Sequence, residues 1–346
     1  MMRAAGKFIN LLVEHVDVIT KPIARKLGIA MATLIMKTTC NTSLLANFLP
    51  LPIKRRSREQ WMRRLLDSKK FTMTILDVFL RRIFNSIHAT RQTIVIAMDQ
   101  TELGNRMATL SCAVRYRGRA LACAWRSLSG PANLGFEYQK ELLDRIHALL
   151  PEGADVIILA DRFYGSDELL AYIRARGWKY RIRLKGVYNV WSPDLPKGCG
   201  KTGDIPVDWK GEVLLFDTLL KTTVAVIHEN PKVNVEPWII ACDSIGRLAQ
   251  VLDYGLRWCI ESMFKDWKSG GFGFAATRVG NPARLDRLLL ILVLAMLFCI
   301  HASVDGDADR PGKTRSLLSD FQYGLRLLGR AIAYGDSRSM GFVICV

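Results

Sequence analysis

The chain has 346 residues, of which 50% are hydrophobic and 23% are charged. This composition excludes a disordered chain, and the length allows one large core with one or two smaller modules. The formal net charge of +17 makes nucleic acid the expected partner, although a generically basic protein or one that touches anionic membrane also fits the charge alone.

Residues 1–90 are predicted to form a small, basic, helical module. Apolar positions recur there every three or four residues, and Pro22, Pro50 and Pro52 divide the segment into pieces. Phosphate contacts need many mobile cations on one surface. The densest run of cations in the module supplies the expected DNA contacts, which are Lys54, Arg55, Arg56 and Arg58.

The pattern changes at Thr93, where short strands begin. Apolar runs at 93–98 and 155–160 each end at an acid, Asp99 and Asp161, and the runs at 108–116 and 120–127 read as a hairpin. Helices are expected at 137–150 and 166–176, with a strand at 179–184. This order predicts a mixed α/β sheet with flanking helices, in a domain that spans residues 91–305.

A β-rich insertion is predicted at about 185–235, because glycines and prolines there separate short β-rich runs. A strand at 236–242 and one long helix at 245–268 follow. The apolar run 288–300 is too short to cross a bilayer and is expected to be a buried core helix, so no membrane contact is expected. Residues 306–346 are expected to form a partly helical tail.

The cysteines and histidines do not suggest a metal site. Eight cysteines are scattered without a Cys-x-x-Cys pair, and no histidine lies near a Cys or another His at ligand spacing. A zinc site and a disulfide framework are therefore not expected, and reduced thiols in the cytoplasm are the plain interpretation.

Acids at the ends of buried strands carry chemical meaning. An ionised carboxylate is costly inside a core, so it belongs where a strand emerges and where a cation can neutralise it. Mg²⁺ prefers carboxylates, water and phosphate oxygens as ligands. Asp99 and Asp161 are candidates for such a site, but each is also explained as a turn former or helix cap. Nearby rivals are Glu102, Asp167 and Glu168.

A third acid lies in the predicted long helix. Steps of three or four residues place an aromatic residue, an acid and three cations on one helix face, namely Tyr254, Arg257, Glu261, Lys265 and Lys268. This face suits a site that holds a phosphate chain beside a metal ion. The alternative is a solvated charged face with an Arg257–Glu261 pair.

These residues resemble the DDE transposases of the insertion-sequence-four type. The family signature Tyr-x2-Arg-x3-Glu-x6-Lys is matched in every spacing by Tyr254, Arg257, Glu261 and Lys268. The sequences Met98-Asp99-Gln100-Thr101 and Asp161-Arg162-Phe163-Tyr164 resemble the motifs of the first and second acids, except that Phe163 replaces the usual glycine.

The resemblance implies a ribonuclease H-like fold with a β-rich insertion before the third acid. Asp99, Asp161 and Glu261 would bind two Mg²⁺ ions, for which Mn²⁺ can substitute, and Tyr254, Arg257, Lys265 and Lys268 would contact DNA. The implied reaction is cut-and-paste transposition: hydrolysis at the inverted-repeat ends of a transposon, then strand transfer to target DNA. A homodimer is expected in the complex that pairs the ends.

Some relatives stack a flipped base on a tryptophan of the insertion. Trp191, Trp209 and Trp238 are available for this, although a core role is the more usual one for each. Two further functions stay open: a catalytically inactive or domesticated DNA-binding relic of a transposase, and another ribonuclease H-like nuclease. The complete signature argues against both.

Overall fold

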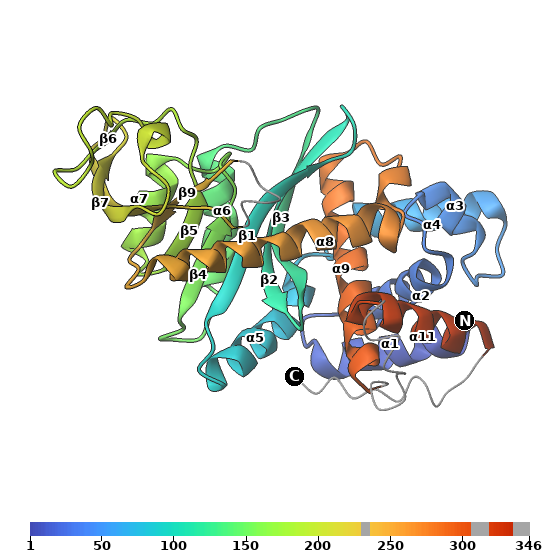
Figure 1. The fold of residues 1–346 in the computed structure, drawn as a ribbon. Helices are drawn as coiled ribbons and strands as arrows, with labels where there is room; N and C mark the ends of the chain where they lie inside the picture. Colours follow the sequence, from blue (N-terminus) through green and yellow to red (C-terminus); the bar gives the residue numbers. More distant parts are fainter. Residues whose placement is uncertain (230–235, 306–317, 335–346) are drawn as a thin grey trace.

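The computed structural model describes residues 1–229, 236–305 and 318–334. Within these ranges the strands form one nine-stranded mixed sheet, in the order β3-β2-β1-β4-β5-β9-β8-β7-β6 (Figure 1). The strands are β1 (Ile94–Glu102), β2 (Met107–Tyr116), β3 (Arg119–Ser129), β4 (Val156–Ala160), β5 (Lys179–Arg183), β6 (Val190–Trp191), β7 (Lys210–Leu215), β8 (Leu220–Ile227) and β9 (Trp238–Cys242).

The first five strands have the ribonuclease H-like arrangement. β1, β4 and β5 are parallel, and the antiparallel hairpin β2–β3 extends the β1 edge. Arg117 and Gly118 join the hairpin, both at positive φ (49° and 71°), which is the geometry of a tight two-residue turn. The mixed α/β fold predicted from the sequence is confirmed.

β1 does not end at its acid, so the expected position of Asp99 was wrong in detail. Pairing with β2 continues to Glu102, whereas pairing with β4 stops at Met98. The polar residues after Met98 break the apolar pattern but not the backbone ladder. Asp99 therefore lies in a strand at the point where the sheet opens on its β4 side.

The predicted β-rich insertion continues the same sheet. β9 pairs antiparallel with β5, and β8, β7 and β6 add to it in turn. A short 3₁₀ helix, η1 (Thr202–Asp204), lies between β6 and β7. Residues 230–235 of the predicted insertion lie outside the described residues. Figure 1 shows these strands at the opposite end of the molecule from the amino-terminal helices.

Helices cover both faces of the sheet. Helices α6 (Phe136–His147) and α7 (Asp167–Ala175) contact β2, β3 and β5. On the other face, a continuous helical segment crosses the strands in front (Figure 1). It begins as the 3₁₀ helix η2 (Leu248–Arg257), continues as α8 (Trp258–Lys265), and ends in the π-helical turn η3 (Asp266–Gly270).

The prediction of one regular helix over 245–268 was thus wrong about its geometry. A 3₁₀ helix has three residues per turn, so the side chains of Tyr254 and Arg257 lie in line along it. The π-helical turn then changes the direction in which Lys268 projects relative to Glu261.

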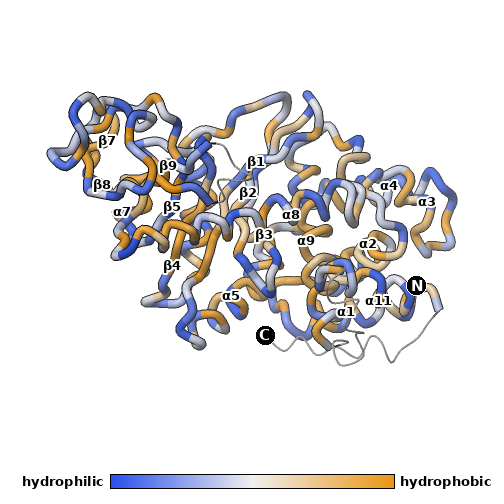
Figure 2. Tube along the Cα trace, viewed as in Figure 1, coloured by the Kyte–Doolittle hydropathy of each residue, from blue (hydrophilic) through white to orange (hydrophobic). Residues whose placement is uncertain are grey.

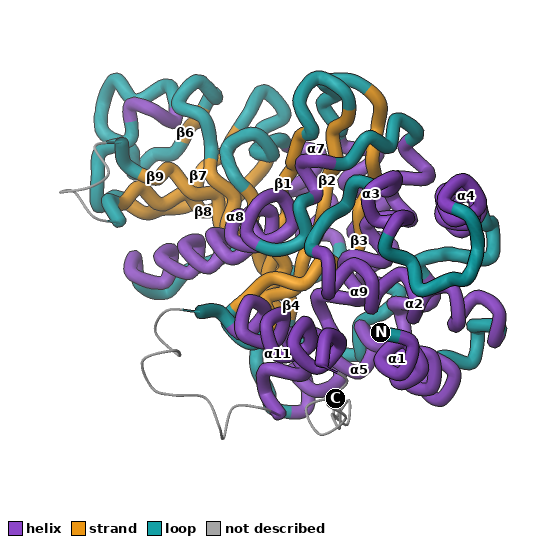
Figure 3. Tube along the Cα trace, turned by 90° about the vertical axis from the view of Figure 1, so that its right-hand side faces the viewer, coloured by secondary structure: helices purple, strands orange, loops and turns teal. Residues whose placement is uncertain are grey.

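The remaining helices gather around α9 (Pro282–Asp305), as Figure 3 shows from the side. They are α1 (Met2–His15), α2 (Lys21–Lys37), α3 (Thr42–Asn47), α4 (Arg55–Asp67), α5 (Thr74–Ala89) and α11 (Asp320–Tyr334), with the short 3₁₀ helix η4 (Phe274–Ala276) before α9. Helix α11 is the described part of the predicted tail; residues 306–317 and 335–346 lie outside the described residues.

Helix α9 is apolar over most of its length (Figure 2). It is long and apolar enough to cross a membrane, but 89% of its apolar window is buried inside the fold. Every residue from Leu288 to Ile300 is buried, as expected for a core helix. The amino-terminal helices, α9 and the sheet share one hydrophobic core.

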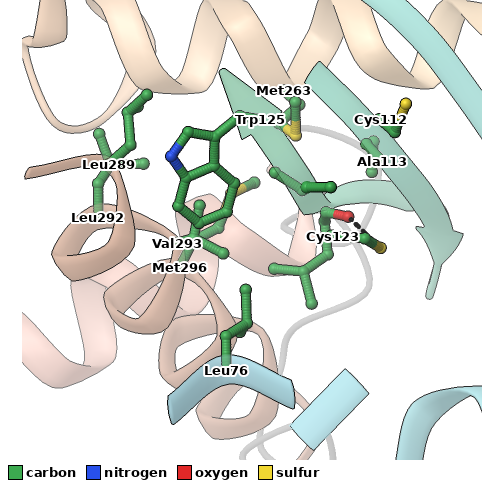
Figure 4. Packing of buried hydrophobic residues seen from close by; sticks show 14 of the residues in the cluster. Leu76, Cys112, Ala113, Cys123, Trp125, Met263, Leu289, Leu292, Val293 and Met296 are labelled. Atoms are coloured by element: carbon green, nitrogen blue, oxygen red, sulfur yellow. Dashed lines mark hydrogen bonds between the residues drawn. The ribbon is translucent and has the colours of Figure 1, made fainter. Parts of the chain in front are cut away.

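Close packing fixes the helix that carries the third acid. Trp125 of β3 lies among Met263 of α8 and Leu289, Val293 and Met296 of α9 (Figure 4). Ile260, Phe264 and Trp267 are also buried, while Glu261 is exposed. Since well-packed cores deform little, the packing of α8 fixes the position of the Glu261 backbone relative to the sheet.

Candidate active site

Asp99 and Asp161 are neighbours across the parallel pair β1–β4. Met98 is in register with Ala160, so the next residue on each strand is an acid. Each carboxylate accepts a hydrogen bond from a nearby backbone N–H: Gln100 N donates to Asp99 Oδ1, and Phe163 N donates to Asp161 Oδ1, both at 2.8 Å. The two acids therefore sit at one opening of the sheet in fixed orientations.

Arg257 links the third acid to the first. Its Nη2 donates to Glu261 Oε1 at 2.6 Å, and its Nη1 donates to Asp99 Oδ2 at 3.2 Å. The sequence brings these groups together because η2 and α8 cross the face of the sheet on which the Asp99 side chain lies. The Arg257–Glu261 pair that was considered as an alternative does form, but it is not a solvated surface pair.

The Arg257 side chain is only 6% exposed, against 43% for Glu261 and 17% for Asp99. Its guanidinium carbon lies 4.9 Å from the ring centroid of Trp258 and 5.7 Å from that of Tyr254. Trp258 is 45% exposed, so the Trp258 side of this cation–π stack is open to solvent.

Burial raises the pKa of Asp99 to about 6. The Gln100 N–H and the Arg257 guanidinium oppose this rise, whereas the negative charges of Asp161 and Glu261 add to it. The charges of the other two predicted acids therefore reach Asp99. A carboxyl with a raised pKa beside two other acids is typical of a functional site.

Two aromatic residues after Asp161 belong to the same region and were missed as site residues. Phe163 is 47% exposed and lies 5.9 Å from Lys185 Nζ. Tyr164 is buried, and within the described part of the chain its hydroxyl has no hydrogen-bond partner. Burial raises the pKa of Tyr164, and the charges of Asp99 and Asp161 raise it further. The replacement of glycine by Phe163 was the only sequence signal here.

The donor atoms suit a hard divalent cation. Carboxylate oxygens are the ligands that Mg²⁺ prefers, and the unpartnered Tyr164 hydroxyl offers a buried polar atom next to two of the acids. Among the described residues, however, no three acidic, His or Cys side chains are close enough together to hold a metal ion. Arg257 supplies the positive charge between Asp99 and Glu261 instead.

The other residues of the predicted signature have different surroundings. Tyr254 is 2% exposed and packs edge-to-face against Trp238, with ring centroids 4.8 Å apart, so its ring is not on the surface. Lys265 is exposed and Lys268 is half-buried. The predicted charged face is therefore buried at one end and open at the other.

The predicted basic run lies at the start of α4, away from the acids. Lys54, Arg55 and Arg56 are exposed. Arg58 is half-buried and donates to the backbone oxygens of Asn47 (2.7 Å) and Leu49 (3.3 Å), so it secures the loop after α3. In Figure 1, α8 runs from the inserted strands toward α3 and α4.

The three tryptophans considered for base stacking also differ. Trp191 is 60% exposed, Trp209 is half-buried, and Trp238 is buried against Tyr254. Exposure therefore favours Trp191 for contact with a ligand.

Residues 136–298 match the family model for a transposase DDE domain. The matched stretch contains Asp161, Arg257 and Glu261 but begins after Asp99. A comparison with curated proteins finds no match. The family match supports a transposase of the DDE type, for which DNA is the implied substrate.

Proposed function

We propose that this chain is a cut-and-paste DNA transposase of the insertion-sequence-four type, with Asp99, Asp161 and Glu261 as its catalytic acids. One observation carries the proposal: Asp99 and Asp161 follow paired residues of β1 and β4, and Arg257 joins Asp99 to Glu261 of α8. The spacing from Tyr254 to Lys268 and the transposase DDE domain match agree with it.

The chain's own groups would divide the work. Asp99, Asp161 and Glu261 would hold two Mg²⁺ or Mn²⁺ ions, which supply activation of the attacking oxygen and stabilisation of the leaving oxygen. The backbone N–H groups of Gln100 and Phe163 hold the two aspartates in place. Lys265 of α8 and Lys268 of η3 would contact DNA phosphates, as would Arg257 in the DNA complex. The proposed role of Tyr254 there is to support Arg257, since its ring is buried against Trp238 and lies 5.7 Å from the guanidinium carbon.

Double-stranded DNA at the inverted-repeat ends and at the target site is the proposed substrate. The module of residues 1–90 would bind it through Lys54, Arg55 and Arg56, which are exposed together on α4. Arg58 would contribute indirectly, by supporting the α3–α4 loop. We further propose a homodimer in the complex that pairs two ends, acting in the cytoplasm.

The test is cleavage of a supercoiled plasmid that carries the DNA flanking this coding sequence. Wild type should nick it at the repeat boundary in Mg²⁺ or Mn²⁺ but not in EDTA. Asp161→Asn should still shift the DNA on a gel but produce no nick. Lys179→Gln changes the first residue of β5, at the end of the parallel strands opposite to Asp161. It removes a pair with Asp155 (2.8 Å) and should cleave normally.

Other products would point to other functions. Binding without cleavage by wild type in either metal would establish a DNA-binding relic. Cleavage without joining of a pre-cut end to target DNA would indicate another ribonuclease H-like nuclease.

A further inference from the structure

Arg257 occupies the space that the proposed chemistry needs. One guanidinium spans Asp99 Oδ2 and Glu261 Oε1, and the other oxygen of Asp99 already accepts from the Gln100 N–H. A divalent ion shared by these acids would bind carboxylates that Arg257 now neutralises. In this arrangement the arginine and the ion compete for the same negative charges.

The guanidinium is not fully satisfied where it lies. Arg257 Nε is buried and, within the described residues, has no hydrogen-bond partner. A buried donor without a partner costs free energy. A phosphate group can accept two parallel hydrogen bonds from a guanidinium, which makes a DNA backbone phosphate a strong alternative partner.

The surroundings leave a way toward solvent. Trp258, which stacks on the guanidinium, is 45% exposed, and Glu261 is 43% exposed at its side chain. Lys265, one turn beyond Glu261 on α8, is exposed as well. To reach a DNA phosphate, the Arg257 side chain must change its rotamer, since close packing fixes the neighbouring helix α8.

We propose that Arg257 is an internal counterion that blocks the acid site in the free chain and is drawn away by a DNA phosphate, so that DNA binding raises the affinity of the acids for a divalent ion. This inference rests on the proposed function. Because coupling between two ligands is reciprocal, the ion also raises the affinity for DNA. The arrangement confines hydrolytic metal chemistry to chains that already hold DNA.

The test is Mn²⁺ binding, measured by calorimetry and by the electron paramagnetic resonance of free Mn²⁺. It uses the full chain with and without a flanking-end duplex whose scissile bond is already cut. In wild type, saturating DNA should tighten Mn²⁺ binding at least about fivefold. Equal affinity with and without DNA would overturn the inference, and this comparison needs no substitution.

Arg257→Gln should bind Mn²⁺ without DNA at least about tenfold more tightly than wild type, because Asp99 and Glu261 then lack their counterion. DNA should no longer tighten the binding. Arg257→Lys, which keeps the charge but cannot span two carboxylates, should fall between them. Lys179→Gln should match wild type. Circular dichroism checks that each variant is folded.

The failures of the two proposals differ. If wild type binds no Mn²⁺ even with DNA, the proposed metal-dependent function fails and the inference falls with it. If Mn²⁺ binds and is lost in Asp161→Asn, but Arg257→Gln behaves as wild type with and without DNA, the inference alone is wrong.

Discussion

Two arginines of this chain each pair with a glutamate four residues later, but in opposite environments. Arg55–Glu59 on α4 has a separation of 3.3 Å and side chains 69% and 37% exposed. Arg257–Glu261 is closer, at 2.6 Å, and its arginine is 6% exposed and also holds Asp99. The sequence spacing is the same. Burial, rather than sequence spacing, therefore distinguishes the two arginines: Arg55 is exposed to solvent, whereas Arg257 is held by two acids of the candidate site.

The largest difference between the two Arg–Glu pairs is expected in DNA cleavage. Glu261→Gln should reduce metal-dependent nicking of the flanking-end plasmid to background, because it removes a proposed ligand while keeping the shape of the side chain. Glu59→Gln changes the matched exposed pair and should cleave as wild type does. Gel assays of initial rate provide the measurement; equal rates for the two variants would contradict the assignment of Glu261.

The two pairs should also differ in stability. Arg257→Ala leaves Asp99 half-buried without its partner and should lower the free energy of unfolding by about 2–3 kcal/mol. Arg55→Ala removes only an exposed helix pair and should cost no more than about 0.5 kcal/mol. Urea denaturation at neutral pH measures both. A similar loss for the two variants would remove the distinction.

Acid titration probes the buried region alone. Because the pKa of Asp99 is about 6 in the folded chain and its ordinary value is 3.8, the folded state holds the proton more tightly. Stability should therefore fall as the pH rises from about 4 to about 6. Asp99→Asn should reduce this fall by about 1–3 kcal/mol.

Urea denaturation at pH 4 and pH 7 measures this fall in wild type and in the variant. Asp266 and Asp286 also have pKa values raised to about 6 by burial, so part of the fall should remain. If the free energy of unfolding of Asp99→Asn fell between pH 4 and pH 7 as much as that of wild type, the Asp99 carboxyl would not titrate in this range.

The smallest effect concerns the exposed cations. Neutralising Lys54, Arg55 and Arg56 together should reduce the slope of log affinity against log salt by about 2–3, since each lost phosphate contact removes about 0.9. The Arg58 side chain donates to the backbone of Asn47 and Leu49. Arg58→Gln should therefore change the slope by less than the loss of one exposed cation does, and should lower the free energy of unfolding instead. Filter binding at salt concentrations from about 50 to about 300 mM measures the slope for each variant. A slope for Arg58→Gln that falls as much as that of the triple variant would contradict the distinction.

Much of the fold could be predicted from short-range patterns. Apolar β-branched runs identified β1 and β4, and the residue after each run located two acids that the structure brings together. Apolar residues at helical spacing identified α8, and the run from Leu288 to Ile300 identified a core helix. These features depend on local chemistry, so the sequence contains them.

Other features depend on distant contacts and could not be predicted. Pairing with β2 carries β1 beyond Asp99, although the residues there are polar. The segment before Glu261 is a 3₁₀ helix that contacts four strands of the sheet, and Trp238 packs on Tyr254. The spacing of the signature placed Arg257 beside Glu261, but only the crossing of η2 over β1 places it against Asp99.

The central claim is that Asp99, Asp161 and Glu261 hold divalent ions when DNA is bound. It is tested most directly by anomalous scattering from crystals of the chain grown with a flanking-end duplex and Mn²⁺. We expect an anomalous peak about 2 Å from oxygens of these three side chains, with Arg257 turned toward a phosphate. A DNA-bound structure with no peak there, and with Arg257 still between Asp99 and Glu261, would contradict it.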